Sequence, residues 1–284
     1  MNTLKLIGGV SAFAFAAAVP TFAEETVPAP TSEQETEMVS EEESPLSVEF
    51  TMDLLSDYVW RGTICNDNAT WQPAVCVSYE TEDYGCLSAA VWSTLDFTHK
   101  RGTTTNSRRA SGCQEIDYTL SYEIELAGIG FEFGHIWYTY PNNNGIDDRE
   151  LYAKATYENP FVTPTAAVYW GYADTSDNRP SRFYYELSLA HDFQIGDQLT
   201  VTPKASLGFG GNAWSRYITY ESLGTELTDQ TIGLSSAYAI TENLSIGAQV
   251  NYTWIPSHTL RKYNYMGLGK DQILWCGLNL TLSF

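Results

Sequence analysis

Acidic and basic side chains recur at even spacing inside apolar segments of this sequence, and they are its clearest candidates for chemistry. Asp53, Asp57 and Arg61 stand four positions apart, and even spacing in an extended strand places side chains on one face. The full set of candidates is Glu49, Asp53, Asp57, Arg61, Asp96, Asp117, Glu123, Glu125, Lys154, Glu186 and Lys204. Carboxylates along a confined aqueous path favour cations. The set therefore predicts the lining of a cation-preferring pore. The alternative is that its Lys and Arg pair with the acids and fill the interior.

The elements that would position these side chains are strands of about ten residues, because apolar residues alternate with polar ones through most of the chain. The closing segment shows the pattern plainly: Leu274, Leu278 and Leu280 alternate with small or polar residues. Twelve such segments are expected, at residues 48–58, 75–79, 87–97, 116–126, 131–137, 151–157, 168–172, 183–189, 199–209, 232–240, 244–254 and 274–284.

The connections between these segments alternate between short turns and longer polar loops. This arrangement, together with Tyr and Trp near the segment ends, is typical of a transmembrane antiparallel β-barrel with short periplasmic turns and longer extracellular loops. In hydrocarbon, strands must close into a barrel so that every backbone polar group finds a partner. A soluble β-sandwich also alternates, but it would not account for the loop lengths, the aromatic ends and the export signal together.

The first part of the chain predicts export. Residues 1–23 resemble a signal peptide, with Lys5 before an Ala-rich apolar segment and a small-x-small site at Thr21-Phe22-Ala23. Residues 24–46 are rich in Glu, Pro and Ser, which is typical of a disordered acidic segment. The barrel is expected at residues 47–284. The net charge of −20, from 15 basic and 35 acidic residues, argues against nucleic-acid binding.

A family resemblance lies in the first hairpin. The stretch Ser56-Asp57-Tyr58-Val59-Trp60-Arg61-Gly62, followed by Asp67-Asn68 and Trp71-Gln72-Pro73-Ala74, resembles the TorF family of bacterial outer-membrane porins, whose first hairpin carries D-Y-x-x-R-G and a downstream Q-P or Q-G. The resemblance implies a channel role without a defined substrate. The cysteines in this hairpin and the acidic segment before it depart from the family.

The parity of the first strand gives each residue of this motif an expected direction. Asp57 and Arg61 are expected on the lumen face, where each would pair across strands, and Trp60 is expected to face lipid at the outer interface. Their role is open between a structural lattice of ion pairs and solute selectivity.

Catalysis is the alternative to transport, and the histidines are its candidates. Some twelve-stranded outer-membrane barrels hydrolyse lipids with a Ser and a His on the lipid-facing surface. The segments beside His135 offer no outward Ser, His191 lies at the turn end, and the loops holding His99 and His258 are basic. No Walker loop, G-x-S-x-G motif or zinc-ligand spacing is present. We therefore expect no enzyme activity, no cofactor and no metal.

Five cysteines in an exported chain permit disulfides. Cys65 and Cys113 fall in neighbouring extracellular loops, and Cys76 and Cys86 flank a short turn with the same lumen-facing parity. The expected pairs are Cys65 with Cys113 and Cys76 with Cys86, which leaves Cys276 as a thiol facing lipid.

These features predict an outer-membrane β-barrel of a Gram-negative-type bacterium that passes small hydrophilic solutes. The alternatives are a closed barrel with a surface-binding or structural role and, third, a lipid hydrolase. Packing of Trp92, Tyr138 and Tyr184 separates the first two, because these side chains would block solutes if they fill the bore. The expected partners are outer-membrane lipid, lipopolysaccharide at the basic loops, and the assembly machinery, which would recognise the terminal Phe284.

Overall fold

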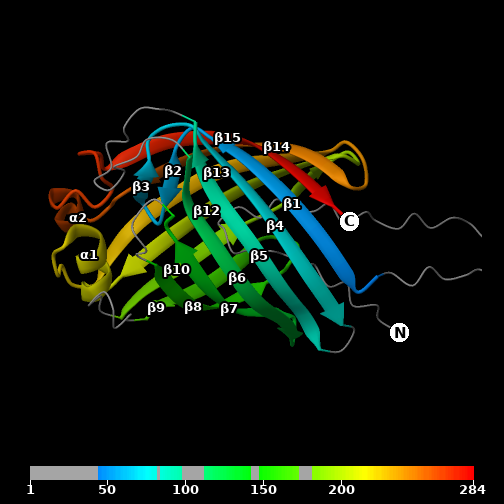
Figure 1. Ribbon diagram of the computed structural model, residues 1–284, viewed down its shortest axis with the longest axis horizontal. Helices are drawn as coiled ribbons and strands as arrows, with labels where there is room; N and C mark the ends of the chain where they lie inside the picture. Colours follow the sequence, from blue (N-terminus) through cyan, green and yellow to red (C-terminus); the bar gives the residue numbers. More distant parts are fainter. Residues whose placement is uncertain (1–43, 82–83, 98–111, 142–146, 173–180) are drawn as a thin grey trace, which may run out of the picture.

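The computed structural model describes residues 44–81, 84–97, 112–141, 147–172 and 181–284. The expected signal peptide and nearly all of the acidic segment lie outside the described residues. Long antiparallel strands form the wall (Figure 1): β1 (Leu46–Leu55), β4 (Thr70–Thr81), β5 (Gly85–Asp96), β6 (Gly112–Leu126), β7 (Ile129–Thr139), β8 (Asp148–Tyr157), β9 (Thr163–Gly171), β10 (Arg182–Ala190), β12 (Leu199–Gly210), β13 (Glu226–Ala239), β14 (Leu244–Trp254) and β15 (Gln272–Ser283).

The wall closes on itself. The order along the sheet is β10-β9-β8-β7-β6-β5-β4-β1-β15-β14-β13-β12-β11, and an additional pairing of β10 with β12 joins the two sides. One of these thirteen strands, β11 (Phe193–Ile195), has three residues and pairs only with the start of β12. The remaining twelve make the predicted transmembrane antiparallel β-barrel, which is confirmed.

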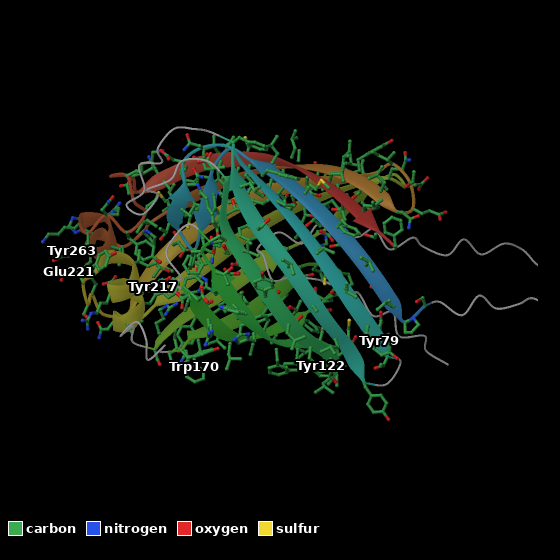
Figure 2. The ribbon with its side chains drawn as sticks, viewed as in Figure 1. Tyr79, Tyr122, Trp170, Tyr217, Glu221 and Tyr263 are labelled. Atoms are coloured by element: carbon green, nitrogen blue, oxygen red, sulfur yellow. The ribbon has the colours of Figure 1, made fainter. Side chains whose placement is uncertain are left out.

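Side-chain alternation gives the wall an apolar outside. In β15, Leu274 and Leu278 are 67% and 59% exposed, whereas Trp275 and Thr281, on the opposite face, are 5% exposed. Aromatic residues are also on the outside: Figure 2 shows Tyr79 and Tyr122 toward one end of the barrel and Trp170 toward the other. The exposed apolar face is what a barrel presents to lipid, since no water is available there for polar side chains.

The connections between wall strands are short at one end of the barrel and longer at the other, as predicted. The end with short turns, here the turn end, also holds the start of β1 and the end of β15, which are joined by paired hydrogen bonds between the backbones of Val48 and Phe284, both 2.9 Å. The other end, here the loop end, holds α1 (Asn212–Thr219), α2 (His258–Lys262) and the small hairpin of β2 (Tyr58–Trp60) and β3 (Thr63–Asn66) (Figure 1). No helix in the described part of the chain is long and apolar enough to cross a membrane.

The β2–β3 hairpin differs from the predicted first strand, which ends at Leu55 rather than continuing to Tyr58. The chain then folds into the bore, and Trp60 packs against the rings of Tyr138 and Trp214. The expectation that Trp60 faces lipid is therefore wrong. Alternation alone cannot show where a strand leaves the wall, because the hairpin keeps an extended backbone.

An apolar core fills the loop-side half of the bore. It brings together wall residues, the hairpin and both helices: Leu55, Ile64, Tyr184, Trp214, Ile255, Leu260, Tyr265, Met266, Ile273 and Trp275. The hairpin is tied to the loop after α2 by a backbone hydrogen bond from Ile64 N to Met266 O, 2.8 Å. The interior thus has a packed loop-side half and a turn-side half lined by small and polar residues.

Candidate functional site

Arg61 lies at the tip of the β2–β3 hairpin and reaches across the bore to Glu150 on β8. Its two terminal nitrogens donate to the two carboxylate oxygens at 2.9 and 2.8 Å. The side chains of Arg61 and Glu150 are 7% and 1% exposed. This is the bidentate, charge-assisted geometry that a planar guanidinium makes with a carboxylate.

Four aromatic rings surround the same guanidinium. The Arg61 Cζ atom lies 4.5 Å from the ring centroid of Trp60, 4.2 Å from Tyr169, 4.6 Å from Tyr184 and 5.1 Å from Trp214. These distances are within the range of cation–π attraction, which is strongest where water is excluded. We call Glu150, Trp60, Tyr169, Tyr184 and Trp214 the arginine cage.

Further hydrogen bonds hold the cage in place. The Tyr138 hydroxyl donates to Glu150 Oε2 at 3.0 Å, and the Tyr184 hydroxyl donates to the Asp229 carboxylate at 3.2 Å. Trp214 Nε1 donates to the Tyr265 hydroxyl at 2.7 Å. The carboxylate and two of the rings are therefore oriented by residues other than Arg61.

Tyr265 also links the cage to the hairpin backbone, because its hydroxyl donates to the carbonyl oxygen of Arg61 at 3.2 Å. Burial, together with the nearby charge of Asp229, raises the pKa of Tyr265 above its ordinary value. The phenol thus keeps the proton that this hydrogen bond needs.

The pKa of Arg61 shows how firmly its charge is held. Burial acts to lower it, but the charge and hydrogen bonds of Glu150, together with the neighbouring Tyr138 and Tyr169, outweigh burial and hold the pKa well above its ordinary value. Arg61 remains a cation at every physiological pH.

The hairpin turn requires the Arg-Gly pair. Arg61 and Gly62 have φ angles of 47° and 76°, and two consecutive positive φ angles are typical of a type I′ hairpin turn. A Cβ atom on Gly62 would lie 2.5 Å from Asp229 Cβ. Glycine is needed both for the turn and for the close approach to β13.

A second buried ion pair joins α1 to the wall. Arg182 on β10 pairs with Asp148 on β8, and the Tyr217 hydroxyl of α1 donates to Asp148 Oδ2 at 2.8 Å. The Arg182 guanidinium lies 3.8 Å from the Tyr217 ring centroid. This contact positions α1, and through it Trp214.

The turn-side wall carries a further group of charges. Glu49, Asp53, Glu123, Glu186 and Lys204 point inward and are half-buried. Asp53 accepts a hydrogen bond from Asn279 Nδ2 at 3.0 Å. On the same part of the wall, Lys154 pairs with Glu132 at 3.1 Å, and both side chains are buried. The wall is therefore polar and more acidic than basic.

The remaining predicted residues are spread along the barrel. Asp96 and Asp117 point inward but are buried in the loop-side half, 6% and 0% exposed. Asp57 lies between β1 and β2 and accepts a hydrogen bond from the Ser56 hydroxyl at 2.8 Å, and Glu125 is exposed near the end of β6. The predicted set is thus divided between the two halves and the turn-end rim, and its role as a pore lining stays a prediction.

The predicted disulfide between Cys76 and Cys86 is wrong. Cys76 lies opposite Ala90, whereas Cys86 lies opposite Glu80. A four-residue offset corresponds to about 13 Å along a strand, beyond the reach of a disulfide. The structure has no Cys76–Cys86 bond. Each thiol instead lies 3.6 Å from a serine hydroxyl, Ser78 or Ser88.

The other three cysteines lie in different surroundings. The side chain of Cys113 lies outside the described residues, so its pairing with Cys65 stays a prediction. Burial, together with the charge of Glu115, raises the pKa of the Cys65 thiol. Cys276 is exposed on the outer face, as its strand parity predicts.

Two of the histidines within the described residues, His135 and His191, lie away from the cage. His135 faces outward, and its Nε2 atom lies 2.8 Å from the Tyr172 hydroxyl. His191 packs against the ring of Phe193 at the turn end, with centroids 4.5 Å apart. His99 is outside the described residues.

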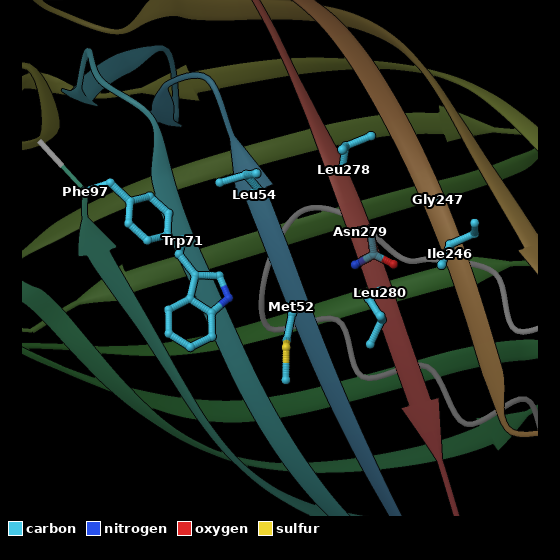
Figure 3. Close-up of a pocket in the computed structure, with 9 residues that line it drawn as sticks. All are labelled: Met52, Leu54, Trp71, Phe97, Ile246, Gly247, Leu278, Asn279 and Leu280. Carbon is cyan, nitrogen blue, oxygen red and sulfur yellow. The ribbon is translucent and has the colours of Figure 1, made fainter.

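An apolar groove of about 630 Å³ lies on the outside of the barrel, over β1, β4, β14 and β15 (Figure 3). Outward side chains such as Met52, Trp71 and Leu278 line it. These residues belong to the lipid-facing surface, so the groove is separate from the polar interior.

Most residues of the cage carry no signal that separates them from their neighbours in the sequence. Glu150 directly precedes the predicted segment 151–157 and is not among the predicted pore-lining residues, and α1 falls in a connection that was expected to be a loop. A signal was present there, because Trp214, Tyr217 and Ile218 have the three- and four-residue spacing of a helix with one apolar face. The pairing of Glu150 with Arg61 spans 89 positions and has no local signal.

Solved structures of outer-membrane barrels resemble this chain weakly. The NanC porin is 11% identical, with 84% of this chain and 98% of that chain covered and a TM-score of 0.47. The KdgM porin is 11% identical, with 84% and 99% covered and a TM-score of 0.44. Outer membrane phospholipase A from Escherichia coli is 15% identical, with 83% and 92% covered and a TM-score of 0.44. Likenesses at this level indicate no function for this chain.

No curated protein matches the sequence. Residues 39–258, which include the hairpin, the cage and α1, match the profile of one bacterial family. The match does not carry the TorF name, so the resemblance to that family stays a prediction. The chain belongs to the family described as bacterial protein of unknown function (Gcw_chp).

Proposed function

We propose that this protein is a porin-like channel of the bacterial outer membrane that passes small hydrophilic solutes, prefers cations, and is blocked at its loop end in this conformation by the β2–β3 hairpin. The observation that carries the proposal is the polar, partly exposed turn-side wall inside a barrel with an apolar exterior. A barrel that served only as a rigid anchor would have no need of half-exposed charges on its inner face.

The cation preference rests on the balance of those charges. Glu49, Asp53, Glu123 and Glu186 face the interior with Lys204 as the half-buried base among them. Fixed carboxylates raise the local concentration of cations and oppose the passage of anions.

Planar-bilayer conductance of the purified barrel under a potassium chloride gradient tests the proposal. We expect rare or small steps from the wild-type protein, because the hairpin blocks the bore. A variant in which residues 57–66 are replaced by a Gly-Ser linker should conduct more, with a reversal potential of cation sign. If this variant folds and inserts but stays electrically silent, the channel proposal fails.

The second candidate is a closed barrel with a structural or surface-binding role. A specific observation favours it: Trp92, Tyr138 and Tyr184 are 4%, 4% and 1% exposed, so they pack tightly in the loop-side half. A silent hairpin-replacement variant would support this candidate. Binding at the loop end would then be sought with lipopolysaccharide, since Arg261 and Lys262 of α2 are exposed there.

The third candidate, a lipid hydrolase, is tested by incubating the folded barrel with phospholipid vesicles and measuring released fatty acid. We expect no release above that from vesicles alone. Release that His135→Ala abolishes would overturn the expectation.

A further inference from the structure

The arginine cage has the parts of a ligand site, although its occupant is a residue of the same chain. Glu150, Tyr169 and Tyr184 belong to the barrel wall, and Trp214 belongs to α1. Arg61 and Trp60 arrive on a separate element, the hairpin. A carboxylate at bidentate distance and rings on several sides are the means by which proteins recognise free organic cations.

The wall part of the cage is also built independently of Arg61. Glu150 is oriented by Tyr138, Tyr184 by Asp229, and Trp214 by Tyr265. Removing the Arg61 side chain leaves these hydrogen bonds in place. The pocket would keep its carboxylate and all four of its rings.

We propose that Glu150, Tyr169, Tyr184 and Trp214 form a binding site for guanidinium-bearing organic cations, and that Arg61 occupies this site as a tethered ligand. The inference rests on the proposed function for its biological meaning, because it names a solute class that would compete with Arg61 at the blocked end of a cation-preferring channel. A planar cation with several N–H donors fits the site, whereas a spherical ammonium cannot make the bidentate contact.

A purely structural ion pair is the competing explanation, and the two differ in what can restore the stability of an Arg61 variant. If the ion pair with Glu150 stabilises the protein only because Arg61 is part of the hairpin, free guanidinium would stabilise the Arg61 variant no more than other salts do. If the cage is a binding site, free guanidinium should bind where the Arg61 side chain has been removed.

The experiment measures the thermal unfolding midpoint of the full-length barrel in detergent micelles with increasing millimolar guanidinium chloride. Sodium chloride and tetramethylammonium chloride at equal ionic strength serve as reference salts. The proteins are wild type, Arg61→Ala, Arg61→Ala/Glu150→Gln, and Arg216→Ala as a control for loss of an exposed basic residue of α1.

We expect a saturable rise in the midpoint of Arg61→Ala with guanidinium and none with the reference salts. Wild type and Arg216→Ala should show no such rise, because Arg61 fills the site. Adding Glu150→Gln should weaken guanidinium binding about tenfold or more, since the charged acceptor is lost.

If Arg61→Ala responds equally to all three salts, the inference is overturned. Should this variant not fold in sodium chloride, its refolding yield becomes the measurement. A yield restored by guanidinium but not by sodium supports the site, and equal yields overturn it. Because no conductance is measured, a barrel that binds guanidinium but never conducts would keep this inference and reject the channel.

Discussion

Arg61 is held by one carboxylate and four rings, and these contacts use different properties of the guanidinium. The bidentate bond to Glu150 uses its fixed fork of donors, whereas the contacts with Tyr169 and Tyr184 use its flat, weakly hydrated faces. A lysine at this position would keep the charge but lose the fork and the stacking.

The first prediction at this scale concerns stability. Arg61→Ala leaves Glu150 buried without the cation that hydrogen-bonds to it, and breaking a buried pair on one side costs about 3–5 kcal/mol. We expect a loss of this order in the free energy of unfolding, measured by urea titration in micelles. Arg216→Ala removes an exposed charge from α1 and should change it by less than about 0.5 kcal/mol. Equal effects of the two variants would contradict the burial argument.

Gly62 gives the second prediction, for which the chain offers a matched control. Gly62→Ala adds a Cβ atom 2.5 Å from Asp229 Cβ at a φ of 76°, whereas Gly128→Ala adds one at a φ of 79° with nothing within 4 Å. The control should show only the backbone strain, about 1 kcal/mol. Gly62→Ala should cost clearly more in the same urea titration. Equal losses in the free energy of unfolding for the two variants would show that the contact with Asp229 does not destabilise Gly62→Ala.

The cysteines give the third prediction. Because Cys76 and Cys86 are offset by four positions across the β4–β5 pair, peptide mapping without reductant should show no bond between them. Cys65 and Cys113 are the pair for which a reducible crosslink is still expected. A crosslinked Cys76–Cys86 peptide would mean that the register of these strands differs from the one described.

At the scale of elements, three segments from different loops pack together inside the bore. The β2–β3 hairpin brings Arg61, α1 brings Trp214, and the segment after α2 brings Tyr265, which hydrogen-bonds to both. None of these elements could bury its apolar face alone, since a short helix or a two-stranded hairpin is marginal in water. Each is stable because the others cover it.

The fourth prediction tests this mutual support. Tyr265→Phe removes the hydroxyl that accepts from Trp214 Nε1 and donates to the Arg61 carbonyl, which leaves both groups buried with one partner fewer. We expect a loss of about 1–3 kcal/mol and faster hydrogen exchange in the hairpin, measured by mass spectrometry. Tyr263→Phe, on an exposed ring two residues earlier, is the control and should leave both unchanged.

The wall strands also show how an unfavourable residue is accommodated. Pro203 lies inside β12, where proline lacks the N–H that a ladder hydrogen bond needs. Its carbonyl oxygen accepts a hydrogen bond from the backbone N–H of His191. His191 lies between the end of β10 and the start of β11, where the pairing with β12 is interrupted. The N–H and C=O of one residue point the same way in an antiparallel strand. The N–H that proline lacks would thus face this gap in the ladder, so little pairing is lost.

At the scale of the whole molecule, the barrel separates two environments along its axis. The loop-side half is packed with apolar and ion-paired side chains, and the turn-side half carries half-exposed charges. In a channel of this design, the loop-side half would set whether solutes pass and the turn-side wall would set which charge is preferred.

The fifth prediction follows from that division. The triple variant Asp53→Asn, Glu123→Gln and Glu186→Gln, made in the hairpin-replacement background, should move the reversal potential toward zero without abolishing conductance. Fixed charges on the wall create the local cation excess that selectivity needs. A variant with Arg261→Ala, at the exposed loop end, should leave the reversal potential unchanged. An unaltered potential in the triple variant would show that selectivity arises elsewhere.

Much of this architecture could be read from the sequence because a membrane barrel imposes a local rule. Each residue of a wall strand faces either lipid or the interior, so the alternation in β15 or β6 is sufficient to assign the inward side chains, and the alternating loop lengths assign the two ends. The Arg-Gly pair likewise marks a tight turn locally. Inward residues such as Asp53, Glu123 and Lys204 were identified on this basis alone.

Only the tertiary structure decided what fills the bore. Asp57 and Trp60 have the parity of a continuing strand, yet the chain leaves the wall after Leu55 because the hairpin gains burial against Trp214, Tyr265 and Met266, which come from distant loops. The contact of Arg61 with Glu150 depends on closure of the barrel, which brings β8 opposite the first loop. The sequence by itself determined the wall, since the alternation of side chains is a local pattern. The packing of the β2–β3 hairpin inside the bore and the arginine cage depend on contacts between segments far apart in the chain, and no local pattern predicts them.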